Sequence, residues 1–275
     1  MKYTTEAYLI QCLTNMHVGS GDTDYGVVDN LVQRNPITEV PTIHSSSLKG
    51  ALREYFSTQT DISSDTINYV FGGDAQRSET NESKEQIGHY KFFQADMIVY
   101  PVRSNKKPFR RATASFLLDD ILAKANSFRI DNVNEKIFAK LSGDNSVEEG
   151  KPLVQHSGER LEGLDTSEGL VIEANNILGQ DLALFHEADF KKLIKKLPTI
   201  ARNQLTNGVS QNLWYEEIVP RESRFLFFVS KPENNSTDTS LSDFEKILDD
   251  CVVQIGANGS IGYGFCSIQK INGYE

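Results

Sequence analysis

Segments patterned like strands alternate with segments patterned like helices along most of this chain. The clearest helix follows Ser45, where apolar side chains recur at the spacing of one helical face, at Leu48, Ala51, Leu52, Tyr55 and Phe56. Further helices are predicted over 115–128, 187–197 and 242–252, and strands over 3–13, 91–102, 170–172, 224–230 and 265–271. Strand–helix–strand units separated by further strands predict an α+β fold, with one sheet and its helices on one face, on the ferredoxin-like plan.

Two polar stretches interrupt this alternation and are predicted to be insertions, at about 57–90 and 129–168. A length of 275 residues allows one large or two modest domains. The continuous alternation favours a single domain over 1–275. Asn207-Gly208 lies between extended segments, and both positions tolerate positive φ, so a hairpin is predicted at about 200–218.

The charge balance is acidic, with 28 Lys and Arg against 38 Asp and Glu, which usually argues against nucleic-acid binding. Residues 103–111 depart from it, with five cations and no acid. This basic strip is either simply solvated or an RNA-facing patch. Three cysteines without a CxxC pair exclude a disulfide scaffold and a cysteine-rich zinc module. With an apolar run no longer than 225–229, a cytoplasmic protein without membrane contact is expected.

Two segments have the chemistry of anion sites. Ser45, Ser46 and Ser47 offer capping hydroxyls and backbone N–H groups at a helix start, with Lys49 one turn later. The segment QIGANGSIGYG (254–264) is rich in glycine but is neither a P-loop nor a dinucleotide fingerprint. Its glycines would let backbone amides approach a phosphate closely. An ordinary capped helix and a simple turn are the alternatives.

Several motifs together resemble a known family: HVGSGDTDYGVVDNLVQR, SSSLKGALR, YPVRS, NLWYEEIVP and QIGANGSIGYG, in this order from His17 to Gly264. They are similar to the RAMP superfamily of CRISPR proteins, and within it to the backbone subunits of type III-B (Cmr) effector complexes. The sequence departs from that pattern at Ala257-Asn258 in the glycine-rich loop and in the unusually polar segment 73–86.

The resemblance implies a modified RNA-recognition-motif-like (ferredoxin-like) core with a protruding thumb hairpin. Copies of the chain would stack as a filament on a CRISPR RNA, together with other Cmr subunits. The thumbs would kink the duplex of guide and target RNA, and the target would be cut beside each kink with a divalent metal, Mg²⁺ or Mn²⁺. A non-catalytic scaffold and a RAMP-type nuclease that processes CRISPR RNA are alternatives within the superfamily. An acidic protein-interaction module is the alternative outside it.

The resemblance places cleavage at Asp29, which would also hold the metal, with His17, Tyr215 and Glu217 beside it. A loop carboxylate can hold Mg²⁺ or position the attacking 2′-hydroxyl, although it can also simply bond its own backbone. Asp22 and Asp24 lie nearby but off the matching position, and His17 could equally be structural. The predicted RNA-binding residues are Arg34, Ser46, Ser47, Lys49, Arg53, Arg103, Arg110, Arg202, Asn203, Gly256, Asn258 and Gly259.

Overall fold

The computed structural model describes residues 2–23, 28–73, 87–130, 133, 141, 147–170, 177–233 and 239–271. An 11-stranded sheet forms its centre. Strand β15 (Arg224–Pro232) lies between β6 (Ala95–Val102) and β1 (Tyr3–Cys12), and β17 (Phe265–Lys270) and the edge strand β16 (Asp250–Gln254) follow β1. These neighbours are all antiparallel.

The sheet continues beyond β6 through short strands. Their order is β7 (Arg110–Thr113), β12 (Leu182–Leu184), β8 (Leu153–Val154) and β11 (Ser167–Glu168). β4 (Thr42–Ile43) pairs with β6, β5 (Lys91–Phe92) pairs with β15, and β9 (Arg160–Leu161) and β10 (Leu164–Asp165) form a separate pair. The residues predicted to be a polar insertion after 129 therefore supply strands that extend the sheet.

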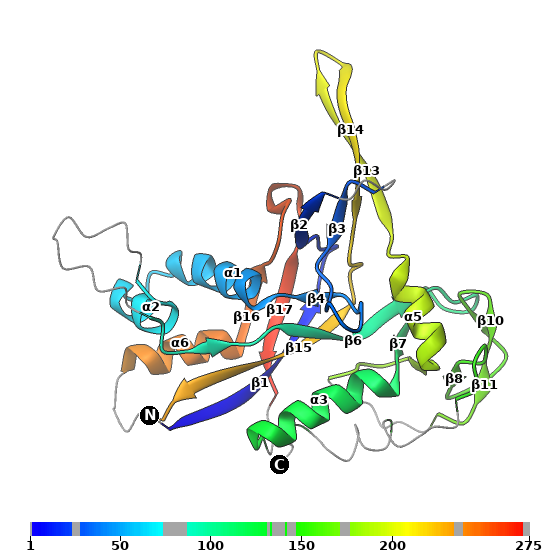
Figure 1. Cartoon of the computed structure of the whole chain (residues 1–275), viewed down its shortest axis with the longest axis horizontal. Helices are drawn as coiled ribbons and strands as arrows, with labels where there is room; N and C mark the ends of the chain where they lie inside the picture. Colours follow the sequence, from blue (N-terminus) through cyan, green and yellow to red (C-terminus); the bar gives the residue numbers. More distant parts are fainter. Residues whose placement is uncertain are drawn as a thin grey trace.

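Both faces of the sheet are covered, which corrects the prediction of helices on one face. Phe225 and Phe227 of β15 share a core with α1 (Ser45–Ser57), α2 (Ser64–Phe71) and α6 (Thr239–Asp249). The alternate residues Leu226 and Phe228 lie in a second core with α3 (Ser115–Phe128). Side chains of a strand point alternately to opposite faces, so these two cores are the two sides of one sheet. Figure 1 shows α1, α2 and α6 grouped together, with α3 apart from them.

Two further elements differ from the sequence predictions. The helix predicted to reach 252 ends at Asp249, and Cys251 and Val252 belong to β16. The stretch 57–90 contains α2, which begins where the Ser63 hydroxyl accepts a hydrogen bond from Thr66 N at 3.1 Å. The most polar part of this stretch, 74–86, lies outside the described residues, as do 131–132, 134–140, 142–146 and 171–176. None of the helices described has the length and apolar character needed to span a membrane.

The predicted hairpin is present and forms a second sheet with two short strands. β13 (Thr199–Thr206) and β14 (Val209–Glu217) meet at Asn207 and Gly208, which have φ values of 52° and 79°. The prediction of a tight Asn-Gly turn is therefore confirmed. β14 also pairs with β3 (Asn30–Val32), which pairs with β2 (Gly19–Thr23). Figure 1 shows the hairpin projecting from the body, while α5 (Glu187–Lys195) lies below its base.

Candidate nucleic-acid interface

Asp29 lies at the base of the hairpin, held by its own backbone and side chain. Its N–H donates to Tyr215 O at 3.1 Å, and its Oδ2 accepts from Tyr215 N at 2.8 Å. The contact follows from the parallel pairing of β3 with β14, which sets Asn30 opposite Glu216. Asp29 is exposed, and among the described residues no hydrogen bond reaches its Oδ1. One carboxylate oxygen is thus fixed by the protein, and the other makes no hydrogen bond with the described residues.

Glu217 is buried at the hairpin base and bonds to residues of and beside β3. Its Oε2 accepts from Val32 N at 3.1 Å, and its Oε1 pairs with Arg34 at 2.6 Å. Its backbone carbonyl lies 2.7 Å from Nδ1 of the buried His17. Because a carbonyl only accepts, Nδ1 carries a proton. Arg34 also donates to the carbonyls of Glu39 and Ile194, both at 2.9 Å, so it is committed to internal contacts.

Glu216 joins the hairpin to the glycine-rich loop. Its Oε1 accepts from Trp214 Nε1 at 2.8 Å, and its Oε2 accepts from Arg202 Nε at 2.5 Å and Asn258 Nδ2 at 3.0 Å. Burial opposes ionisation, but the hydrogen bonds from Trp214 and Arg202 outweigh it and hold the pKa of Glu216 below its usual value. The Arg202 guanidinium lies 4.7 Å from the centre of the Tyr263 ring. Both strands of the hairpin are therefore fixed to the body through this carboxylate.

The glycine-rich loop packs directly against the backbone beside His17. Ala257 N donates to His17 O at 2.8 Å, and a Cβ at Gly256 would lie 2.3 Å from the same oxygen. Gly264 is equally restricted, since its Cβ would lie 2.1 Å from Ile255 O. Both glycines have positive φ, so they serve close backbone packing. Gly259 lies in the short 3₁₀ turn that follows Asn258 and packs on the Gln254 side chain.

The serines at the start of α1 occupy its first turn and are not its cap. The N-cap is His44, which makes no side-chain capping hydrogen bond, so the predicted serine cap is wrong. Ser46 is exposed. The Ser47 hydroxyl accepts from Gln33 Nε2 at 2.9 Å, and the same amide donates to Gly19 O at 3.1 Å. Gln33 thus ties the start of α1 to the start of β2.

Lys49 and Arg53 of α1 and Lys91 of β5 are close enough for their charges to interact, and we call them the lysine–arginine cluster. Burial, then the charges of Lys91 and Arg53, lower the pKa of Lys49. Lys49 has no hydrogen bond or ion pair with any described residue, and Lys91 donates to the carbonyl of Gly88 at 2.9 Å. Arg53 donates to the carbonyl of Gly72 at 2.9 Å. Neither lysine has a carboxylate partner in the described part of the chain, so positive charge is concentrated here.

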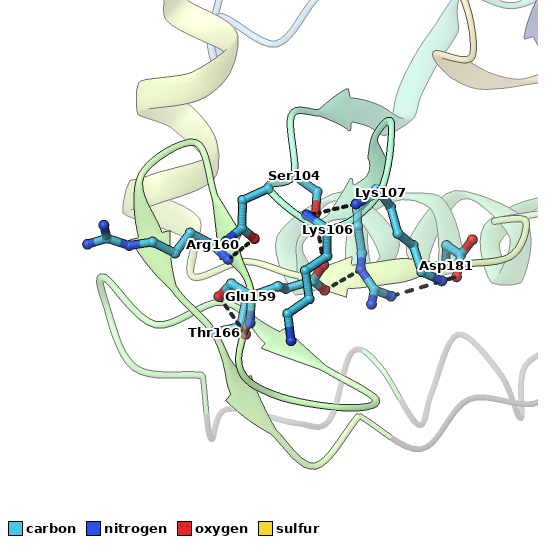
Figure 2. Close-up of polar contacts among 9 residues, drawn as sticks. Ser104, Lys106, Lys107, Glu159, Arg160, Thr166 and Asp181 are labelled. Atoms are coloured by element: carbon cyan, nitrogen blue, oxygen red, sulfur yellow. Dashed lines mark hydrogen bonds and ion pairs between the residues drawn. The ribbon is translucent and has the colours of Figure 1, made fainter.

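The basic strip, in contrast, is paired with carboxylates. Arg110 is buried beside Glu159, Lys107 pairs with Asp181, and Ser104 donates to Glu159 at 2.8 Å (Figure 2). At the ends of the strip Arg103 pairs with Glu162 at 2.8 Å and Arg111 with Glu222 at 2.6 Å. Of the five cations of the strip, only Lys106 has no carboxylate partner among the described residues. The strip is therefore not simply solvated, and its ion pairs join it to Glu159, Glu162, Asp181 and Glu222.

The structure thus brings together one part of the predicted site. Asp29, Tyr215, His17, Glu217, Arg34, Arg202, Gly256 and Asn258 belong to a continuous network at the hairpin base. The lysine–arginine cluster and the basic strip lie apart from it, and Asn203 bonds Ser210 within the hairpin at 2.7 Å. Glu216, Gln33 and Tyr263 belong to the network but were not predicted. The sequence prediction names Glu217 of the motif NLWYEEIVP as a site residue. Its neighbour Glu216 points to the opposite face of β14, because side chains alternate along a strand.

The donors around Asp29 limit how it could bind a metal ion. The described residues contain no group of three His, Cys, Asp or Glu side chains that could hold an ion. The Asp22 side chain and Asp24 lie outside the described part. Mg²⁺ often uses one or two carboxylates, several waters and substrate phosphates. The exposed carboxylate of Asp29 fits that mode of binding.

Comparisons with known proteins agree on one family. The model of the RAMP superfamily matches residues 9–267. The "CRISPR system Cmr endoribonuclease Cmr4" of Pyrococcus furiosus is 29% identical over an alignment that covers 96% of this chain and 95% of the relative. The "CRISPR system CMR subunit Cmr4" of Saccharolobus solfataricus is 24% identical and covers 99% of both chains.

Solved structures show the same fold. A chain in the cryo-EM structure of type III-B Cmr-beta bound to cognate target RNA has a TM-score of 0.79 at 21% identity, covering 97% of both chains. The crystal structure of oligomeric Cmr4 from Pyrococcus furiosus has a TM-score of 0.66 at 18% identity, covering 98% of this chain and 99% of the other. With a family model that spans nearly its full length, this chain belongs to the RAMP superfamily.

Proposed function

We propose that this chain is a backbone subunit of a type III-B RNA-targeting complex and that it cleaves target RNA at Asp29. The observation that carries the proposal is an exposed carboxylate clasped to Tyr215 at the base of a projecting hairpin, in a chain with full-length likeness to a named Cmr endoribonuclease. Its partners would be CRISPR RNA, target RNA, further copies of itself and other Cmr subunits.

The core would be a modified ferredoxin-like fold, and the β13–β14 hairpin its thumb. The order of elements β1, α1, β6, β15, α6 and β17 follows the β-α-β-β-α-β plan. Its four strands lie in the order β17, β1, β15, β6 with antiparallel neighbours, which supports this assignment. The thumb would stand between successive nucleotides of the target and splay them.

Asp29 would act on the splayed target nucleotide. Attack by a 2′-hydroxyl needs the attacking oxygen, the phosphorus and the leaving oxygen in line, and the thumb would supply that orientation. The carboxylate oxygen of Asp29 that is not bonded to Tyr215 would hold the hydroxyl or accept its proton. A Mg²⁺ ion held by Asp29 would neutralise charge on the phosphate. His17 and Glu217 would position the hairpin base, since both are buried and bonded within it.

Two substitutions at Asp29 test this function in the complex assembled with guide RNA. Asp29→Ala should lower target cleavage by about 100-fold or more while binding of guide and target stays within about twofold, because phosphate contacts dominate affinity. Asp29→Asn keeps an acceptor for Tyr215 N but removes the charge, and cleavage should fall equally. Asp119→Ala, an exposed carboxylate on α3, is the matched control and should cut normally.

The rival functions predict other outcomes. Cleavage that survives Asp29→Asn would support a scaffold beside another nuclease subunit. Cutting of CRISPR repeat RNA by the isolated chain would support a processing nuclease, and absence of RNA retention at low salt would support a protein-interaction module. The finer assignment of the thumb needs a separate variant.

Shortening the hairpin to a minimal turn tests the thumb. The residues that flank Asn207-Gly208 are mostly exposed, so the shortened chain should fold and assemble on guide RNA. Target cleavage should fall sharply, because the duplex would run past Asp29 without a kink. Unchanged cuts at the same regular spacing would place the thumb in another segment.

A further inference from the structure

A row of polar residues crosses the sheet at the end farthest from the hairpin. Thr5 of β1 lies opposite Ser230 of β15, and Ser230 lies opposite Lys91 of β5. Opposed residues in a sheet share a face, and this face is the one covered by α3, because Ala7 and Phe228, two positions further along their strands, pack in the α3 core. The row is thus a floor of one ammonium and two hydroxyls. The oxygens of Thr5 and Ser230 are hydrogen-bonded to each other at 2.7 Å, and each keeps further bonding capacity for a ligand.

The floor is left partly open because α3 ends beside it. Phe128, the last residue of α3, packs against Phe93 and Phe228, with ring centres 4.9 and 5.7 Å apart. Beyond it an open surface hollow of about 410 Å³ lies over the row, bounded also by Arg129 and Tyr3. We call it the edge pocket. Its volume is within the range of small-molecule sites, and Tyr3 contributes an aromatic wall that is 38% exposed.

The pocket carries two cations and is lined by no acidic residue. Among the described residues Lys91 donates only to the carbonyl of Gly88, and the Arg129 side chain has no hydrogen bond or ion pair there. Arg129 ends α3 with φ 56° and ψ 49°, a left-handed conformation in which glycine or asparagine is usual. The helix end itself is slightly negative, and the two cations outweigh it. A cationic side chain therefore occupies a position where the backbone conformation favours glycine or asparagine.

We propose that the edge pocket binds a nucleotide. Lys91 and Arg129 suit a phosphate, the Thr5 and Ser230 hydroxyls suit a ribose, and the aromatic walls suit a base. The same chemistry is presented by a free nucleotide and by one unit of a single RNA strand. The pocket lies at the other end of the sheet from Asp29, so this assignment does not rest on the cleavage function.

The test measures binding of four probes to the full chain by calorimetry. The probes are adenosine 5′-monophosphate, adenosine, inorganic phosphate and a single-stranded tetranucleotide. Arg129→Gly is the sharpest variant, because it removes the guanidinium while glycine suits the left-handed position. Lys91→Ala is the second variant. Lys106→Ala changes the net charge equally at an exposed lysine of the basic strip and is the matched control.

The expected result is binding of the monophosphate that weakens about tenfold in each variant and stays within twofold in the control. The melting temperature of Arg129→Gly should not fall. A tetranucleotide that binds more tightly than the monophosphate, with the same sensitivity to both variants, identifies the RNA strand as the source. Equal binding of the two identifies the free nucleotide.

Three results would overturn the assignment. The first is a wild-type chain that does not bind the monophosphate. The second is unchanged binding in both variants. The third is adenosine or inorganic phosphate binding as tightly as the monophosphate, since a nucleotide site uses both halves of its ligand.

Discussion

Two regions of this molecule are rich in positive charge, and they use it differently. The basic strip has five cations in nine residues, but four of them pair with Glu159, Glu162, Asp181 or Glu222. The lysine–arginine cluster has only three cations, and its two lysines have no carboxylate partner among the described residues. The denser region is neutralised, whereas the two lysines of the sparser one keep their charge.

The difference shows that the pairing of a cation, more than local density, decides whether it is available to a ligand. A paired cation must leave its carboxylate before it can bind a phosphate. An unpaired cation beside another cation is destabilised by their repulsion, and a bound anion reduces that repulsion. We therefore expect RNA contacts at the cluster and structural effects at the strip.

Breaking the strip at its buried pair should have the largest effect. The side chains of Arg110 and Glu159 are only 9% and 2% exposed, so Arg110→Ala would leave an uncompensated buried carboxylate. The free energy of unfolding in urea should fall by about 3–5 kcal/mol. Replacing both partners with apolar residues, as Arg110→Met with Glu159→Leu, should recover most of that loss. If Arg110→Ala were as stable as the wild type, the pair of Arg110 and Glu159 would not contribute to the stability of the fold.

Removing two cations of the cluster should have the next largest effect, and on RNA binding alone. Lys49→Ala with Arg53→Ala should weaken guide RNA binding about tenfold for every guide sequence, since phosphate contacts carry no sequence information. The slope of log K against log salt should fall by roughly 1.4 for two lost contacts on a single strand. The same change of charge in the strip, Arg103→Ala with Lys107→Ala, is the control. Equal weakening by both pairs would remove the distinction between the regions.

The sequence predicted elements whose signals are local. The apolar stripe of α1, the helix at 115–128 and the Asn207-Gly208 turn were all placed correctly, because spacing and turn chemistry act over a few residues. Local patterns also misled: Val252 continues the apolar spacing of α6 but lies in the edge strand. Helix α2 was missed because its polar surroundings hid the spacing of Ile67, Val70 and Phe71.

Long-range pairing could not be predicted from one sequence. The partners of the strip lie 49 to 111 residues further along the chain, as Arg110 with Glu159 and Arg111 with Glu222 show. Asp29 and Tyr215 are 186 residues apart and meet because β3 joins the hairpin sheet. Family resemblance named several of the residues at the hairpin base. It did not distinguish the roles of Glu216 and Glu217, which depend on the face of β14 that each one occupies.

Breaking an exposed ion pair of the basic strip should have a smaller effect than either of these changes. Arg103 makes a two-pronged contact with Glu162, but its side chain is 88% exposed. Solvent screens such pairs, so Arg103→Ala should leave both the unfolding transition and RNA affinity unchanged within error. A clear loss of RNA affinity would mean that Arg103 exchanges its carboxylate for a phosphate.

The smallest expected effect is a fractional proton taken up when RNA binds the cluster. Burial and the neighbouring cations lower the pKa of Lys49 from its ordinary 10.5, so at about pH 9.5 part of this group has lost its proton in the free chain. Because this pKa is lower in the folded than in the unfolded chain, the fold gains stability as pH rises through that lowered pKa toward 10.5. A bound phosphate favours the charged form, so RNA binding should take up protons, and affinity should fall as pH rises. Calorimetry in buffers of different ionisation enthalpy measures that uptake. Lys49→Arg keeps the charge at all these pH values and should abolish it, whereas the same uptake in that variant would assign the proton to another group.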